Sequence, residues 1–237
     1  MSELAYVFAL PLLALGVALM TKADFGVSMV VAPAYVLHLK LVTLHPFFTF
    51  GALEYMVQGT LLIVLCLILR AFRPAYLLSF VTAVLYGFTL DGFIFLCRPI
   101  PADSFVLRVV WFVLGMVLCA IGVSLMVHTY LAPEVYELFV KEFSAKFHFR
   151  ISRVKTVYDI ASTLLAVILS FIFFGMWRFE GVKLGTIICA FVNGFLIGQC
   201  SKFLDRHFTF YDRFPLRKWF EMTDTAKEDQ EQKEITP

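Results

Sequence analysis

Three carboxylates lie within strongly apolar stretches of the sequence: Glu54, Asp91 and Asp159. A charged side chain at the centre of a bilayer costs about 2.5–3.5 kcal/mol on insertion scales, so such residues are functional candidates by default. A carboxyl group in a low-dielectric site holds a proton more readily than it does in water. We therefore expect protonation of Asp91 or Glu54 to couple solute movement to a proton gradient.

Three more polar residues join this candidate set. Gln58 and Asn193 lie near the middle of apolar stretches, and His128 lies at the end of one. Structural interpretations stand beside the functional ones: the two amides can bond between helices, His128 can be an interfacial anchor, and Glu54 can favour a helix N-terminus. Asp91 has apolar residues on both sides, so it is either functional or paired.

The constellations typical of soluble enzymes and metal sites do not occur in this sequence. The five cysteines show no CxxC spacing, the five histidines show no metal-ligand pair on one predicted helix, and no Gly-rich phosphate loop is found. A formal net charge of +2 gives no basic stripe for a nucleic acid. We therefore expect no enzyme activity, no cofactor, no metal ion and no nucleic-acid partner.

The composition indicates that a bilayer surrounds most of the chain. Apolar residues make up 60% and charged residues 16% of the 237 positions, against about 45–50% and 25% in soluble domains. The first apolar stretch lacks the basic start and cleavage site of a signal peptide, so we expect it to remain as a span. The sequence predicts an all-α transmembrane protein with six spanning helices, at about 4–21, 51–69, 75–97, 105–127, 156–176 and 183–201.

Two shorter segments interrupt this series of spans. Residues 27–44 are apolar but contain Pro33, His38 and Lys40, and residues 133–149 form an amphipathic helical pattern with several charges. The second segment is too highly charged to cross a bilayer cheaply. We expect each segment to be a short re-entrant or interfacial helix, and the sequence leaves both alternatives open.

The sequence also indicates an internal duplication. Three pairs of segments match in the same order, at offsets of 106, 103 and 107 residues: 15–20 with 121–126, 55–62 with 158–165, and 87–88 with 194–195. Residues 1–103 and 104–205 then form two membrane repeats, each reading span, short helix, span, span. Because three spans per repeat turn the second repeat upside down, we predict a three-plus-three inverted repeat.

The inverted repeat places one polar cluster near each mouth of the protein. Lys22, Asp24, Glu54 and Asp91 belong to one cluster, and His128, Lys155 and Asp159 belong to the other. Residues close to span ends can instead snorkel toward the interface. A short helix held by the carboxylates of these clusters, next to the turns at Gly26 and Pro133, is the predicted solute site.

The distribution of basic residues predicts the orientation. With a cytoplasmic N-terminus, fourteen Lys and Arg residues face the inside and six face the outside, as the positive-inside rule requires. The cytoplasmic tail, residues 206–237, supplies much of this excess. We expect its first part to be aromatic and basic at the headgroup layer, and the part from Glu221 onward to be disordered.

One stretch of the sequence is similar to a known family. ALGVALMTKADFGVSMVVAPAYVLH, together with Gly185-Thr186 and Asn193-Gly194, resembles the span-and-turn and GT signatures of the YczE/YitT-like bacterial membrane proteins. Met29-Val30 stands where many members have Pro-Trp, which leaves the subgroup open. The resemblance implies a bacterial inner-membrane location. It assigns no substrate and no functional residue.

We expect a secondary transporter or carrier of a small, unidentified solute, with the lipid bilayer as its surroundings. The alternative is a membrane accessory protein that acts through a partner at its cytoplasmic face and tail. A homo-oligomer and a cytoplasmic partner both remain open.

Overall fold

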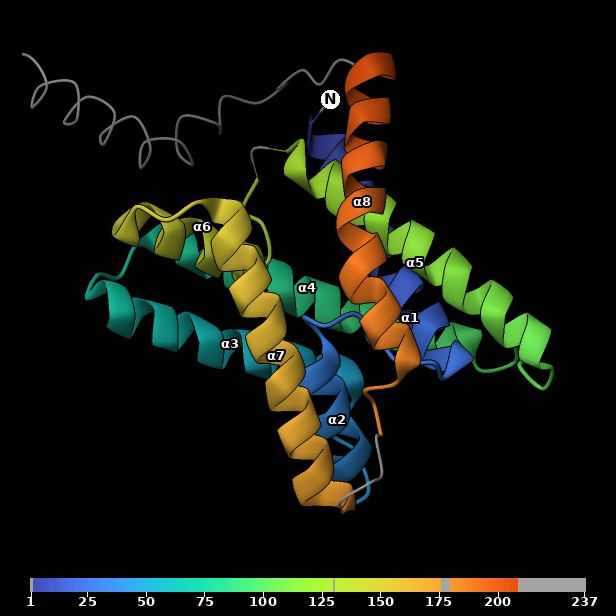
Figure 1. Ribbon diagram of the computed structural model, residues 1–237. Helices are drawn as coiled ribbons and strands as arrows, with labels where there is room; N and C mark the ends of the chain where they lie inside the picture. Colours follow the sequence, from blue (N-terminus) through green and yellow to red (C-terminus); the bar gives the residue numbers. More distant parts are fainter. Residues whose placement is uncertain (1, 130, 176–179, 209–237) are drawn as a thin grey trace, which may run out of the picture.

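The computed structural model describes residues 2–129, 131–175 and 180–208, and within these ranges the chain is entirely α-helical, without strands (Figure 1). Eight helices follow one another: α1 (Ser2–Ala23), α2 (Ala32–Leu41), α3 (Phe50–Leu69), α4 (Pro74–Cys97), α5 (Phe105–Val127), α6 (Val135–Phe147), α7 (Ile151–Phe174) and α8 (Leu184–His207). The expectation for the tail beyond residue 208 falls outside the described residues.

Six of these helices are long and apolar enough to cross a membrane: α1, α3, α4, α5, α7 and α8. The chain is therefore a multipass membrane protein with an all-α transmembrane fold, as the composition predicted. Large apolar side chains on every one of these helices are exposed on the outside of the bundle, as contact with lipid requires. Examples are Phe8, Leu67, Phe95, Phe105, Ile172 and Phe191.

Two boundaries of the spanning helices differ from the sequence prediction by more than two residues. α7 begins at Ile151, five residues earlier than predicted, and α8 continues to His207, six residues beyond its predicted end. Basic residues mark both extensions: Arg153 and Lys155 in the first, Arg206 in the second. An apolar span predicted from hydropathy ends where charged residues begin. The helix itself continues past the bilayer core, because its backbone still forms hydrogen bonds and its charged side chains reach the interface.

Small residues set the central helix crossing. α1 packs along α5, and Gly16 faces Gly115 where the two backbones meet. A Cβ atom added to Gly115 would lie 2.6 Å from the Gly16 carbonyl oxygen, and one added to Gly16 would lie 2.7 Å from the Gly115 oxygen. Since apolar helices gain no hydrophobic energy from each other in lipid, close backbone approach of this kind supplies much of their packing.

Most helix contacts have a counterpart that is found by exchanging α1 to α4 with α5 to α8, in that order. α1 packs on α4 as α5 packs on α8, α2 packs on α7 as α6 packs on α3, and α2 packs on α3 as α6 packs on α7. Two contacts break this correspondence. α3 and α4 lie closely side by side, whereas α7 and α8 diverge (Figure 1). α6 also packs on α4, without comparable packing of α2 on α8. The first half is therefore compact and the second half is open.

The two short helices lie inside the bundle and run along the spans. The N-terminus of α6 meets α3 at Gln58, its ninth residue, because the Val135 N–H donates to Gln58 Oε1 at 3.0 Å. Its other end reaches the end of α3, where Lys146 Nζ donates to the Ile68 carbonyl at 2.7 Å. α6 therefore starts about 12 Å along α3 and returns to the end at which α5 finished.

α2 makes the corresponding excursion from the other end of the bundle. Its C-terminal part lies beside the start of α3, where His38 Nδ1 donates to the Phe48 carbonyl at 2.8 Å and the Tyr35 and Phe50 rings are 5.0 Å apart. α7 runs past α6 at one end and α2 at the other (Figure 1). This is the geometry of two half-helices that enter the bundle from opposite ends.

The crossing of α1 and α5 predicts a sharp difference between glycines. Gly115→Ala should lower the stability of the purified protein by about 1–3 kcal/mol, because the new methyl group overlaps the α1 backbone. The matched control is Gly198→Ala in α8, where nothing lies within 4 Å and the better helix former should stabilise slightly. Thermal unfolding in detergent measures both. Equal melting temperatures for the two variants would show that the crossing is looser than described.

Candidate functional site

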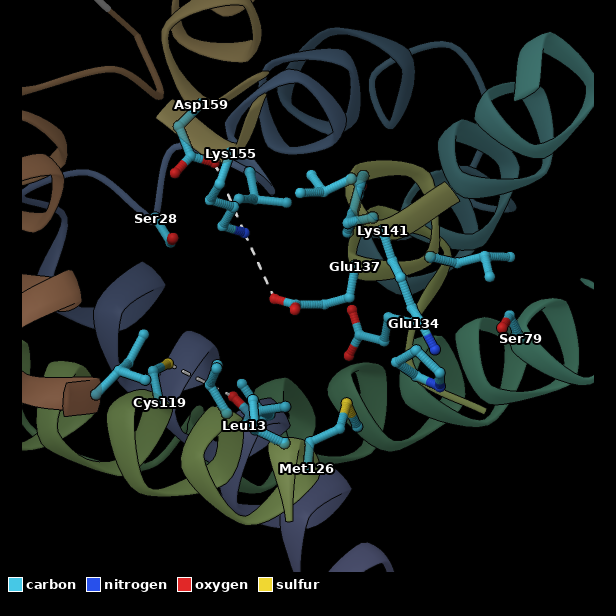
Figure 2. Close-up of a pocket in the computed structure, with 18 of the residues that line it drawn as sticks. Leu13, Ser28, Ser79, Cys119, Met126, Glu134, Glu137, Lys141, Lys155 and Asp159 are labelled. Carbon is cyan, nitrogen blue, oxygen red and sulfur yellow. Dashed lines mark hydrogen bonds and ion pairs between the residues drawn. The ribbon is translucent and has the colours of Figure 1, made fainter. Parts of the chain in front are cut away.

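A cavity of about 1030 Å³ lies between the two halves of the bundle. Its wall includes both short-helix N-termini: Ser28 to Val31 ahead of α2, and Ala132 to Glu134 ahead of α6. The acidic side chains in the wall are Glu134, Glu137, Glu142 and Asp159. The basic ones are Arg73, Lys141 and Lys155. Figure 2 shows Glu134 and Glu137 extending from α6 into this space.

The cavity belongs to one end of the bundle. Tyr76 lies at the start of α4, His128 follows the end of α5, and Ile151 begins α7, and all three line the cavity. Because successive spans alternate in direction, these three helix ends lie on the same side. From there the cavity extends inward to Leu13 and Val17 in the middle of α1. It is thus a one-sided cavity that reaches the centre of the protein.

Gln58 joins the two halves next to the cavity-lining residue Glu134. Besides accepting the Val135 N–H, its Nε2 donates to Glu54 Oε1 and to Glu134 Oε2, both at 3.4 Å. Gln58 and Glu54 are fully buried. One amide thus satisfies an open backbone donor of α6 and contacts two carboxyl groups. We call Glu54, Gln58 and Glu134, with the Val135 N–H, the Gln58 network.

Glu134 is a candidate functional residue that the sequence prediction missed. It is only 8% exposed, and its Oε1 has no hydrogen-bond partner among the described atoms. Burial, reinforced by the negative charge of Glu137, raises the pKa of the Glu134 carboxyl to about 8. In the sequence it follows Pro133 at the start of an amphipathic helix, where an exposed carboxylate at a helix N-terminus is the usual interpretation. No local signal distinguishes the two cases.

An ion chain crosses the cavity wall from α6 to α7. Lys155 Nζ lies 3.4 Å from Glu137 Oε1 and 3.7 Å from Asp159 Oδ1 (Figure 2). Asp159 was a sequence candidate, and its pairing with Lys155 one turn away agrees with the predicted proximity. Within this row of ion pairs, Asp159 Oδ1 accepts no hydrogen bond. One lysine therefore neutralises one of two carboxylates that face the cavity.

The remaining candidates fall at different places. Asn193 and His128 line the cavity, and His128 Nε2 contacts Asp205 Oδ1 at 2.8 Å, joining the ends of α5 and α8. Asp91 lies apart from the cavity, at the other end of the bundle. Its two oxygens accept from the Thr49 hydroxyl at 2.6 Å and the Gly51 N–H at 2.8 Å.

Asp91 therefore pairs at the start of α3, through the Gly51 N–H and the Thr49 hydroxyl, rather than at a short helix. This is the structural alternative of a paired side chain, and a role of Asp91 in coupling transport stays a prediction. Glu54 joins the Gln58 network with Glu134 rather than a mouth cluster with Asp91, Lys22 and Asp24, and its role in coupling stays a prediction as well.

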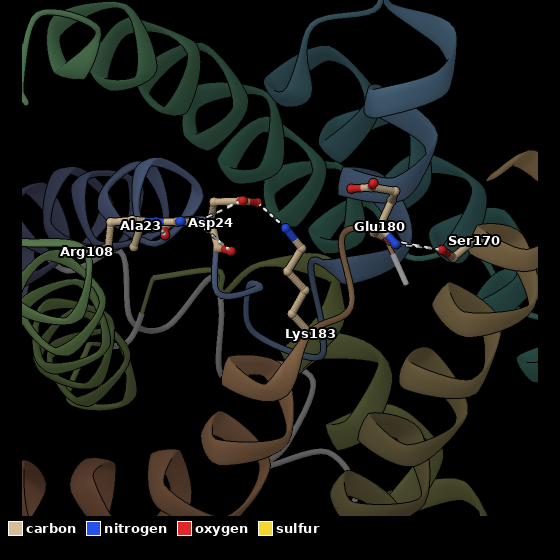
Figure 3. Close-up of polar contacts among 6 residues, drawn as sticks. All are labelled: Ala23, Asp24, Arg108, Ser170, Glu180 and Lys183. Carbon is tan, nitrogen blue, oxygen red and sulfur yellow. Dashed lines mark hydrogen bonds and ion pairs between the residues drawn. The ribbon is translucent and has the colours of Figure 1, made fainter. Parts of the chain in front are cut away.

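A second ion cluster closes the bundle at the end opposite the cavity. Asp24 Oδ2 lies 2.9 Å from Arg108 Nη2, and its Oδ1 lies 2.5 Å from Lys183 Nζ (Figure 3). Arg108 Nε also donates to the Ala23 carbonyl at 2.7 Å, and the Gly185 N–H donates to the Phe25 carbonyl at 2.8 Å. These contacts tie the end of α1 to the starts of α5 and α8. We call them the Asp24 cluster.

Comparison with known proteins gives a family but no activity. The model of DUF6198, described as a family of unknown function, matches residues 1–202. Neither the curated proteins nor the solved structures include a significant match. The resemblance to the YczE/YitT-like proteins stays a prediction.

The burial of Glu134 predicts a pH dependence of stability. Its pKa is about 8 in the folded protein and near 4.5 when exposed, so the folded state holds a proton that the unfolded state releases. Relative to Glu134→Gln, the wild type should lose stability as the pH rises from about 4.5 to about 8, by up to about 1.4 kcal/mol per pH unit.

Melting temperatures in detergent between pH 4.5 and pH 9 measure this difference. Asp103→Asn, a change at an exposed residue away from the cavity, should leave the wild-type pH profile in place. Parallel profiles for the wild type and Glu134→Gln would contradict the assignment.

Proposed function

Because the chain belongs to DUF6198, a family of unknown function, its role has to be inferred from the cavity, and we propose that it is a secondary carrier of a small solute. The observation that carries the proposal is a cavity that reaches the centre from one end while ion pairs close the other end. A carrier that exposes its site to one side at a time needs a conformation of this kind. A volume of about 1030 Å³ accommodates a small organic molecule.

We further propose that the two halves are inverted repeats. The exchange of helix contacts between the halves supports this, as does the same order of span, half-helix, span and span in each. The half-helix N-termini then border one site from opposite ends, where their free N–H groups and dipoles act on a solute. The resemblance to YczE/YitT-like proteins is part of the same proposal.

The asymmetry of the halves supplies the transport movement. α3 and α4 pack closely, whereas α7 and α8 diverge around the cavity. In an inverted repeat, the alternative conformation follows if the halves exchange these arrangements, so that α7 and α8 close while α3 and α4 separate. The Asp24 cluster opens in that step, because it joins α1 and α5 to α8.

The orientation completes the proposal. With both termini cytoplasmic in a bacterial inner membrane, the open cavity faces the cytoplasm and the Asp24 cluster faces outside. Arg73, Lys141 and Lys155 at the open end agree with the positive-inside rule. The accessory-protein alternative depends on the segment after residue 220, which lies outside the described residues.

Accessibility of the cavity from each side tests the carrier function. In a variant without native cysteines, Ser28→Cys should react with a membrane-impermeant thiol reagent from the side of residues 70–73 and stay protected from the Asp24 side. Adding Asp24→Asn should raise labelling from the Asp24 side about fivefold, the effect of losing roughly 1 kcal/mol of preference for the closed end.

Asp103→Asn is the matched control, since Asp103 is an exposed carboxylate in the connection between α4 and α5. It should leave the labelling unchanged. Equal labelling from both sides in the parent variant would indicate a channel. Protection that Asp24→Asn does not relieve, with no uptake of any solute class into proteoliposomes, would favour the accessory protein.

A further inference from the structure

We infer that the cavity binds a small organic ammonium ion, with the Glu134 carboxylate as its anchor and with release of the proton that this carboxyl otherwise holds. The inference rests on the proposed function and names the class of solute for the same site. It starts from hydrogen-bond acceptors in the wall that have no donor.

Within the described part of the chain, three buried carboxyl or amide oxygens of the cavity-lining residues accept no hydrogen bond: Glu134 Oε1, Asp159 Oδ1 and Asn193 Oδ1. Of these, Asp159 Oδ1 has an ion-pair partner, Lys155 Nζ at 3.7 Å. Glu134 is more than nine-tenths buried and extends into the cavity (Figure 2). Buried polar atoms are nearly always hydrogen-bonded in proteins, so three acceptors around one cavity call for a ligand that donates. An ammonium group brings up to three N–H donors and a charge.

The charges around the site favour a cation over an anion. Glu54, Glu134, Glu137 and Asp159 face two lysines, Lys141 and Lys155. Arg73 is 3.6 Å from Glu142, so this further pair balances itself. With all groups ionised, the site would carry two negative charges in excess. In a low-dielectric interior that excess is stable only when protons or a bound cation neutralise it.

The rest of the wall explains why the cation is organic. Four apolar residues of α1 and α5 line the cavity: Leu13, Val17, Val123 and Met126. Figure 2 shows Leu13 and Met126 across the cavity from Glu137. The volume is far larger than one dehydrated metal ion requires. An alkyl ammonium ion places its charge at Glu134 and buries its carbon chain against these apolar residues, which gains hydrophobic energy in addition to the ion pair.

The surroundings of Glu134 support exchange between a proton and the ammonium ion. The charged groups that act on it are Glu54 from α3, Glu137 from α6 and Lys155 from α7. Tyr6, Tyr86, Tyr136 and Cys119 face it from α1, α4, α6 and α5, and Gln58 contacts it from α3. Burial and the negative charge of Glu137, opposed by Gln58 and Lys155, raise the pKa of the Glu134 carboxyl to about 8, so it holds a proton near neutral pH.

The exchange balances in charge. An ammonium ion that binds brings one positive charge, and the carboxyl proton that leaves removes one. The net charge of the occupied site therefore equals that of the empty, protonated site, so binding adds no uncompensated charge to the interior. Across a membrane, this exchange moves an organic cation and a proton in opposite directions.

The test uses full-length protein in detergent at pH 7 and matched probes. The ammonium probes are n-butylammonium and ethanolammonium, each with one positive charge and three N–H donors, and n-butyrate and n-butanol are four-carbon probes with negative or no charge. At least one ammonium probe should raise the melting temperature of the wild type. Glu134→Gln should weaken that probe's binding about tenfold or more, while Asp103→Asn should not change it.

Calorimetry in two buffers of different ionisation enthalpy then measures proton release. We expect up to one proton released per bound ammonium ion in the wild type at pH 7 and none in Glu134→Gln. The inference is overturned if no ammonium probe binds the wild type, if butyrate or butanol binds as well as butylammonium, or if Glu134→Gln binds the ammonium ion with unchanged affinity.

Uptake into proteoliposomes separates this inference from the carrier function. If an ammonium probe binds with proton release but is never taken up, the carrier function fails and the binding site stands. If another solute class is taken up while no ammonium probe binds, the carrier function stands and the assigned solute class is wrong.

Discussion

The hydrogen bonds of Gln58 are the interaction on which the arrangement of this protein depends. A half-helix that starts in the middle of a bilayer presents free N–H groups where no water satisfies them, and each such group costs several kcal/mol. Gln58 Oε1 takes the Val135 N–H, and its Nε2 reaches two carboxyl groups. Without this amide, α6 could not begin at that depth, and Glu134 would not lie at the centre of the protein.

The position of α6 also determines how the charges around the cavity are distributed. Glu134 is its N-cap residue and Glu137 lies in its first turn, so the positive end of the helix dipole meets two carboxyl groups from its own chain. Lys155 from α7 compensates Glu137 and Asp159 only in part. The helix dipole and one lysine thus leave part of this negative charge uncompensated, and the proposed ammonium ligand would compensate it.

The sequence was sufficient for the spans, because apolar length is a local property that needs no tertiary information. It also singled out Gln58, Asp159 and Asn193 as candidates, since polar residues in apolar stretches stand out without a structure. The contacts of Asp91 and Glu134 could not be predicted for one reason: the partner of each lies far away in the chain. Asp91 meets Thr49 and Gly51 across a helix pair, and Glu134 meets Gln58 from the other half. In the hydropathy pattern, Asp91 stands out because it lies in an apolar stretch, whereas Glu134 does not stand out at the start of an amphipathic helix.

The contact pattern makes the two ends of the bundle dependent on each other. α1 of the first half and α5 of the second half cross at Gly16 and Gly115. The other matching helix contacts of the two halves are arranged around this crossing. Because the two backbones touch at this crossing, α1 and α5 cannot come closer there. In the proposed carrier, a movement that brings α7 toward α8 at the cavity must therefore separate contacts at the other end of the bundle. The Asp24 cluster joins α1, α5 and α8 at the end of the bundle opposite the cavity. Its ion pairs are partly exposed, so breaking them costs little free energy. A carrier of the proposed kind needs a rigid centre, here the α1–α5 crossing, and an end held shut by contacts that break easily, here the Asp24 cluster. One end can then open while the other closes.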